Sequence, residues 1–179
     1  MKKVYLFGIL ITVFVLGWFL ISKTSQGPTE NSNALSEREV QLEKAPTFSL
    51  HDYSGGIVSL ADFAGKPLLI NSWAAWCPFC RKELVDFAIA QKEFGDQIVI
   101  IAIDRAESLQ VAKGYTDQQG TTNDLLFLLD PKDSFYRSIS GFSMPETIFV
   151  NENGLIVEHK RGPMDINEIR EKIEKLLAL

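Results

Sequence analysis

Cysteine and histidine are scarce in this chain of 179 residues, which contains two of each. Two cysteines exclude a small fold held by several disulfides and a zinc site with four cysteine ligands. His51 and His159 lie far apart in the sequence, so we expect no metal site. A nucleic-acid-binding protein needs a basic face, and the formal net charge of −5 argues against one.

Charged residues are absent from residues 4–21, the longest apolar run in the chain. As a helix rising about 1.5 Å per residue, this run would span roughly 27 Å, close to the thickness of a bilayer's hydrocarbon core. It lacks the small-residue cleavage pattern of a signal peptide and the following cysteine of a lipoprotein. With Lys2 and Lys3 before it, the run predicts that residues 1–21 form a cytoplasmic tip and an uncleaved cell-membrane anchor, with the rest of the chain outside the cytoplasm.

Large apolar residues are also few in residues 22–45, which are rich in Ser, Thr, Asn, Gln and Glu. Such a composition does not bury enough apolar surface to form a core. We therefore expect residues 22–45 to be a flexible linker and residues 46–179 to form one globular domain.

The two cysteines, Cys77 and Cys80, are separated by only two residues. They follow a run of apolar and small residues, 68–75, that is typical of a buried strand, and they precede a segment with helical spacing of apolar residues. A Cys-x-x-Cys pair at such a junction predicts a dithiol/disulfide redox site. We expect Cys77, at the N-terminus of the helix, to be the nucleophile, because the helix dipole and free N–H groups stabilise a thiolate. Pro78 is tolerated in a first helical turn, and Cys80, one turn in and more buried, would resolve the mixed disulfide.

Strand and helix patterns alternate through the middle of the domain. This alternation predicts an α/β fold with a parallel sheet covered on both faces, ending in an antiparallel pair. The expected elements are a hairpin over residues 48–60, strands over 68–73, 97–104, 125–129, 147–150 and 155–159, a helix from about Pro78 until Gly95, and helices over 108–118, 134–139 and 166–177.

Four segments carry a resemblance to a known family: residues 45–50 (APTFSL), 65–77 (GKPLLINSWAAWC), 144–150 (MPETIFV) and 154–162 (GLIVEHKRG). Together they resemble the TlpA/ResA-like branch of the thioredoxin superfamily, and Pro78 with the Pro-Glu-Thr run resembles its DsbE or CcmG type. The resemblance implies a thioredoxin fold, with a central mixed sheet flanked by helices and an N-terminal β-hairpin extension. It also implies a membrane-anchored, extracytoplasmic thiol–disulfide oxidoreductase with no cofactor beyond the Cys77–Cys80 disulfide.

The resemblance also implies roles around the cysteines. Pro145 would be a cis-proline beside the disulfide, and the backbone of Met144 would pair with the substrate chain. Trp76, with Pro78 and Phe79 between the cysteines, would shape the substrate-binding surface. The implied partners are cysteine-containing extracytoplasmic proteins, such as apocytochrome c, and a membrane thiol electron carrier.

Acidic residues near the site are candidates for proton transfer or partner binding. Glu83 follows Cys80 by one helical turn and is a candidate catalytic acid, with a solvated surface glutamate as the alternative. Asn71 stands where cytoplasmic thioredoxins carry a buried aspartate, and asparagine does not act as a base. Glu146, after the proline, is a candidate partner contact.

Two other functions are known on the same fold. A peroxiredoxin-type peroxidase carries a threonine three residues before its reactive cysteine, where this chain has Ala74. A Sco-like copper chaperone has three residues between its cysteines and a suitably placed histidine.

Within the favoured function, Pro78 offers no N–H and Phe79 no charge to stabilise a thiolate. We therefore expect a reductant, nearer to about −270 mV than to about −120 mV.

Overall fold

The computed structural model describes residues 42–179, so the predicted anchor and most of the predicted linker lie outside the described residues. Among residues 42–179, no helix has the length and apolar character needed to cross a membrane. The domain begins slightly before the predicted boundary at residue 46. The N–H of Ile156 donates to Glu43 O (2.7 Å) and that of Ala45 to Gly154 O (2.9 Å), so residues 43–45 already belong to it.

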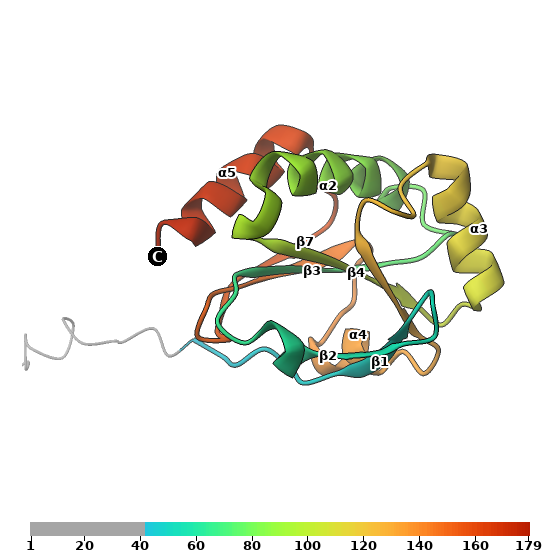
Figure 1. Cartoon of the computed structure of the whole chain (residues 1–179), viewed down its shortest axis with the longest axis horizontal. Coiled ribbons are helices and arrows are strands. Elements are labelled where there is room, and N and C mark those ends of the chain that lie inside the picture. The colour runs from blue at the N-terminus through green and yellow to red at the C-terminus, as the bar shows by residue number, and fades with distance from the viewer. Residues whose placement is uncertain (1–41) are drawn as a thin grey trace, which may run out of the picture. The chain divides into compact units, whose positions relative to one another are not determined.

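The described elements follow the predicted order along the chain (Figure 1). The strands are β1 (Ser49–Asp52), β2 (Ile57–Ser59), β3 (Leu68–Trp73), β4 (Val99–Arg105), β5 (Leu126–Asp130), β6 (Glu146–Val150) and β7 (Ile156–Arg161). The helices are α2 (Cys80–Phe94), α3 (Leu109–Gln119), α4 (Ser134–Ser138) and α5 (Ile166–Leu177), with 3₁₀ turns η2 (Leu60–Phe63) and η3 (Gly95–Gln97).

The strands form one mixed sheet in the order β2-β1-β5-β4-β3-β6-β7. Strands β3, β4 and β5 are parallel, whereas β6 is antiparallel to β3, β7 to β6, and β1 to both β5 and β2. This arrangement confirms the predicted α/β thioredoxin-like fold. Every residue of β3 is buried, because helices cover both faces of a central parallel strand.

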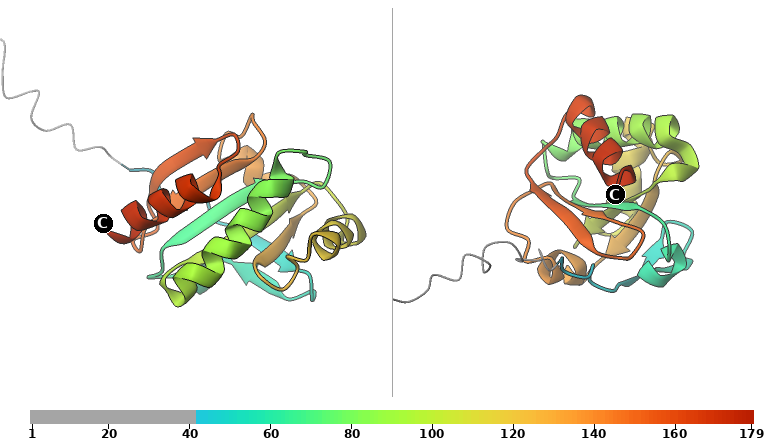
Figure 2. Two further views of the ribbon diagram at one scale, coloured as in Figure 1. Left: turned by 90° about the horizontal axis from the view of Figure 1, so that it is seen from above. Right: turned by 90° about the vertical axis from the view of Figure 1, so that its left-hand side faces the viewer.

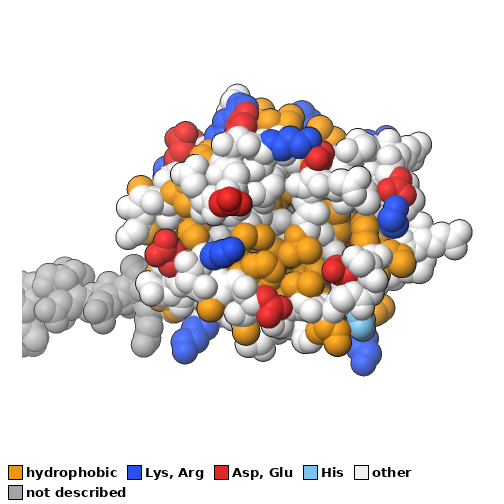
Figure 3. Space-filling model, in the orientation of Figure 1, with side chains coloured by type: hydrophobic (Ala, Val, Ile, Leu, Met, Phe, Trp, Pro, Cys, Tyr) orange, Lys and Arg blue, Asp and Glu red, His pale blue; other side chains and the backbone are white. Residues whose placement is uncertain are grey.

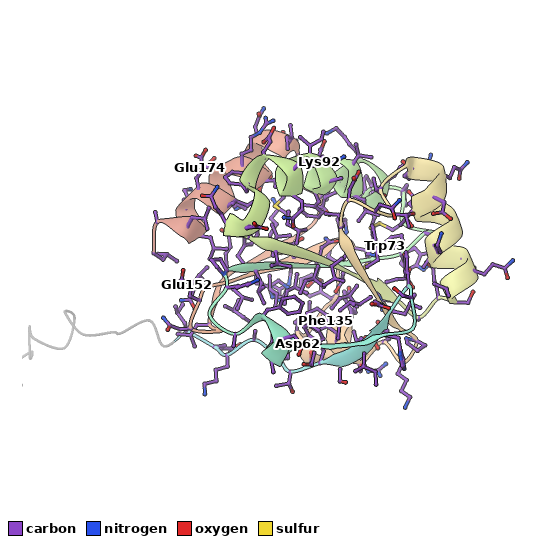
Figure 4. The ribbon with its side chains drawn as sticks, viewed as in Figure 1. Asp62, Trp73, Lys92, Phe135, Glu152 and Glu174 are labelled. Atoms are coloured by element: carbon purple, nitrogen blue, oxygen red, sulfur yellow. A yellow bond between two sulfur atoms is a disulfide. The ribbon has the colours of Figure 1, made fainter. Side chains whose placement is uncertain are left out.

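Helices cover the two faces of the sheet unequally. Helices α2 and α5 lie side by side over one face, with α3 beyond them, and α4 lies on the opposite side (Figures 1 and 2). Side chains alternate along a strand, so Leu69 and Ile100 pack toward α2 while Ile70 and Ile101 pack toward α4. In Figure 4, Trp73 and Phe135 mark these two core layers.

Surface charges of both signs are interspersed around exposed apolar side chains on the face shown in Figure 3. One exposed ion pair links two helices, because Arg170 Nε of α5 donates to Glu93 Oε2 of α2 at 2.7 Å. Exposed ion pairs typically contribute about 0–1 kcal/mol. Helix α5 is therefore held mainly by burial of Ile169, Ile173 and Leu176 against the core.

The sheet brings three loops to one edge. Ser72 of β3 pairs with Glu146 of β6, so the end of β3 and the start of the antiparallel β6 lie together. Trp73 of β3 pairs with Asp104 of the parallel β4. The segments after β3, before β6 and after β4 therefore meet at this edge, where the two cysteines lie.

Candidate active site

Cys77 and Cys80 are joined by a disulfide with their Cα atoms 5.4 Å apart. Cys77 is 2% exposed and Cys80 is fully buried, so Cys77 is the more exposed residue of the pair. The backbone N–H of Cys80 donates to Cys77 Sγ at 3.2 Å. A reduced site would therefore offer a Cys77 thiolate one backbone donor, which favours ionisation of Cys77.

Helix α2 begins at Cys80, with Phe79 as its N-cap residue. The prediction that Pro78 lies in the first helical turn and Cys80 one turn further in is therefore wrong. A residue that precedes proline is disfavoured in helical conformation, and the N–H of Cys77 instead donates to Ala74 O at 3.1 Å in a separate turn. Cys77 lies three residues before the first residue of α2, at the end toward which the helix dipole and its free N–H groups point.

Exposed apolar residues surround the disulfide. Trp76 and Phe79 are each 62% exposed, and Pro78 is also exposed. Met144 is half-buried and packs against the core cluster that contains both cysteines. The Met144–Pro145 peptide bond is cis, which confirms that sequence-based prediction. The predicted substrate-binding residues thus lie on the segments that meet at this edge.

Glu83 is buried beneath the site, so the alternative of a solvated surface glutamate is wrong. Its Oε1 accepts from the backbone N–H of Met164 at 2.9 Å, and its Oε2 accepts from Asn71 Nδ2 at 3.1 Å. Burial raises the pKa of Glu83 to about 8, although these two hydrogen bonds and the charge of Lys160 oppose the rise. Glu83 therefore changes its protonation state close to neutral pH, one helical turn from Cys80.

Asn71 connects Glu83 to the sheet. Its Nδ2 lies 2.9 Å from Thr147 Oγ1 on β6 and 3.1 Å from Glu83 Oε2 on α2. An amide at this position of β3 donates to the carboxyl of Glu83, a contact that an ionised aspartate would oppose. Asn71, at the position where a buried aspartate was considered, therefore holds the carboxyl of Glu83 in place.

Glu146 does not face a partner. Its side chain is fully buried, and Oε1 accepts from the backbone N–H groups of Phe142 (2.7 Å) and Ser143 (2.6 Å). Its Oε2 lies 2.7 Å from His159 Nε2. The expectation of a partner contact is wrong for this side chain, which instead fixes the loop before Pro145.

Two further acidic residues, Asp104 and Glu107, lie at the end of β4 and just after it, and no sequence-based prediction included them. Asp104 is fully buried, and neither carboxylate oxygen has a hydrogen-bond partner among the described residues. Burial, the neighbouring Glu107 and the charge of Asp130 raise its pKa to about 9. Glu107 Oε2 accepts from the backbone N–H of Ala75 at 2.7 Å, two residues before Cys77. The sequence signal for this site was Asp104 itself, a charged residue at the end of the apolar run that forms β4.

Among residues 42–179, no three side chains of His, Cys, Asp or Glu gather in an arrangement that could hold a metal ion. His159 is bound to Glu146, and His51 Nδ1 lies 3.2 Å from Gly55 O in the hairpin. The Cys77–Cys80 disulfide and the buried acids near it support thiol–disulfide exchange.

Comparisons with known proteins agree with this chemistry. Residues 41–177 match the Redoxin family. The thioredoxin-like protein YneN of Bacillus subtilis is 31% identical over 97% of this chain and 99% of its own length. The thiol:disulfide interchange protein DsbE of Allochromatium vinosum is 31% identical over 75% of this chain and 74% of its own. Among solved structures, a putative DsbE from Chlorobium tepidum has a TM-score of 0.70 at 22% identity, covering 76% of this chain and 96% of its own, and shows the shared fold.

Proposed function

We propose that this chain, which belongs to the Redoxin family and is a thiol–disulfide oxidoreductase of the ResA/DsbE type, reduces disulfides in proteins outside the cytoplasm. The observation that carries the proposal is the Cys77–Cys80 disulfide, with Cys77 the more exposed of the two, on the same core cluster as Met144 and its cis-proline. The exposed Trp76 and Phe79 offer apolar contacts to a target polypeptide.

The reaction proceeds through two thiol–disulfide exchanges. The thiolate of reduced Cys77 attacks one sulfur of a target disulfide, whose other sulfur leaves as a thiolate and takes up a proton. The thiolate of Cys80 then attacks Cys77 Sγ and releases the second target sulfur. The target gains two electrons and two protons, and the enzyme is left with the Cys77–Cys80 disulfide. An external dithiol must reduce it again.

Glu83 would accept the proton of Cys80 in the second exchange. Cys80 is buried, so its thiol does not release a proton directly to bulk water, and Glu83 lies one turn along the same helix. A carboxyl with a pKa of about 8 is closely matched to a thiol with an ordinary pKa of about 8.5. At neutral pH the ionised fraction of Glu83 would act as the base.

Glu83→Gln is expected to slow disulfide reduction about tenfold at pH 7. As pH rises, ionisation of Glu83 adds to the rate of the wild type with a midpoint of about 8, and glutamine removes that contribution. The rate of insulin reduction between pH 6 and 9.5 measures it. Glu174→Gln makes the same change on the exposed surface of α5 and should leave the profile intact. An unchanged profile for Glu83→Gln would remove Glu83 from the mechanism.

We base the proposed direction, reduction of the target, on the small number of groups that stabilise the Cys77 thiolate. One backbone N–H reaches Cys77 Sγ, Pro78 has none, and Phe79 carries no charge. We expect a potential nearer to about −270 mV than to about −120 mV, as in reducing members of the superfamily. Equilibration with glutathione measures it, and a value near −120 mV would instead indicate an oxidant.

The proposed location rests on the sequence of residues 1–45, and the proposed partners rest on the family resemblance. Residues 1–21 would anchor the protein in the cell membrane, and Lys2 and Lys3 would keep the N-terminus in the cytoplasm, so that the domain lies on the extracytoplasmic side. Targets are cysteine-containing proteins there, with apocytochrome c as one candidate, and a thiol carrier in the membrane would supply electrons. The support is the apolar run of residues 4–21 and the family resemblance.

A further inference from the structure

Phe142 is 77% exposed and lies in the loop between α4 and β6. It precedes Met144 by two residues, so the two Cα atoms are at most about 7 Å apart. Met144 packs against the cluster that contains Cys77 and Cys80. An unburied aromatic ring therefore lies within one side-chain length of the surface where a target chain would bind.

The loop that carries Phe142 is held firmly at its backbone. The carboxylate of the buried Glu146 accepts from the N–H groups of Phe142 and Ser143, and Tyr136 Oη donates to Ser143 O at 2.7 Å. Gly141 lies so close to the ring of Tyr136 that a Cβ atom there would be 2.4 Å from it. Phe142 is thus exposed on a loop whose conformation is fixed by buried contacts.

The ring itself is also restrained. The guanidinium of Arg161 lies 4.9 Å from the ring centroid of Phe142, within range of a cation–π interaction. Arg161 Nε lies 3.7 Å from Glu146 Oε2, so the same buried carboxylate orients the arginine. A ring that is restrained before binding loses little conformational entropy when a partner covers it, as is typical of binding hot spots.

We propose that Phe142 determines target specificity by binding a large apolar side chain that lies within about two residues of the target cysteine. The occupant is an extended target polypeptide, because its sulfur must reach Cys77 while its backbone lies along Met144. Trp76 and Phe79, next to the cysteines, and Phe142, two residues before Met144, are all exposed apolar side chains that a bound target could cover. This inference rests on the proposed function.

The test uses two synthetic peptides that share one intramolecular disulfide and differ by Phe or Ser beside the first cysteine. The wild type is expected to reduce the Phe peptide with about tenfold higher kcat/KM, mainly through a lower KM. Phe142→Ala should remove that preference, and Phe142→Leu should retain most of it. Ile57→Ala removes a similarly exposed apolar side chain on β2 (70% exposed) and should keep the preference.

Reduction of bis(2-hydroxyethyl) disulfide separates this inference from the proposed function. The small disulfide has no flanking side chain, so the wild type and Phe142→Ala should reduce it at equal rates. A retained peptide preference in Phe142→Ala, or an equal loss on the small disulfide, would overturn the specificity role. A wild type that reduces neither substrate would overturn the proposed function itself.

Discussion

Replacing Cys80 with serine is expected to stop the reaction at a mixed disulfide between Cys77 and the target protein. Cys77 is the more exposed cysteine and receives the N–H of residue 80, so it still attacks a target disulfide. A serine hydroxyl does not displace the target sulfur, and turnover should fall at least about a hundredfold. Non-reducing electrophoresis followed by mass spectrometry measures the adduct and identifies the proteins trapped in it.

Cys77→Ser is the matched control for the trapping experiment. Its only remaining thiol, on Cys80, is fully buried at the start of α2, so no adduct should accumulate. Both variants lose the disulfide and so share any effect on folding. Adducts formed equally by both variants would show that the two cysteines do not have separate roles, and the assignment of Cys77 as the nucleophile would be wrong.

The fold could be predicted because its strongest signals are local. The run of residues 68–73 combines four apolar residues with Asn71 and Ser72 and has no polar alternation, as is typical of a central strand covered on both faces, and it is β3. The spacing of Ile169, Ile173 and Leu176 predicts one buried face, and these residues are buried in α5. The start of α2 could not be placed to the residue, because Pro78 suits both a first helical turn and the turn that precedes one.

The acids of the site could not be ranked from the sequence, because their states depend on contacts made by distant residues. Glu83 is buried through Asn71 and Met164, which are 12 and 81 residues away. Glu146 follows Pro145, a position that suggested a partner contact, yet its buried carboxylate accepts from the backbone N–H of Phe142. Exposure of that ring likewise follows from the loop's fixed backbone and has no sequence signature.

Asp104 illustrates how such a buried acid affects stability. Its pKa is raised from an ordinary 3.8 to about 9, so the folded protein holds a proton that the unfolded chain releases above about pH 4. The ionisation equilibrium of Asp104 therefore costs no stability below its unfolded pKa, and stability is lost as pH rises from there toward its folded pKa. The groups that oppose its ionisation are Glu107, Asp130 and the apolar core around Trp73.

Asp104→Asn is therefore expected to stabilise the oxidised protein increasingly as pH rises from 4 to 9. Asparagine has the same shape, does not titrate, and can donate to the carboxylate of Glu107. The gain in the free energy of unfolding should be under about 0.5 kcal/mol at pH 4 and at least about 2 kcal/mol at pH 8, with a slope of at most about 1.4 kcal/mol per pH unit. Urea unfolding at each pH measures it. Asp96→Asn, an identical change at an exposed position, should show no such slope. A gain that is independent of pH, or a loss at pH 8, would mean that Asp104 is ionised and paired in the folded protein.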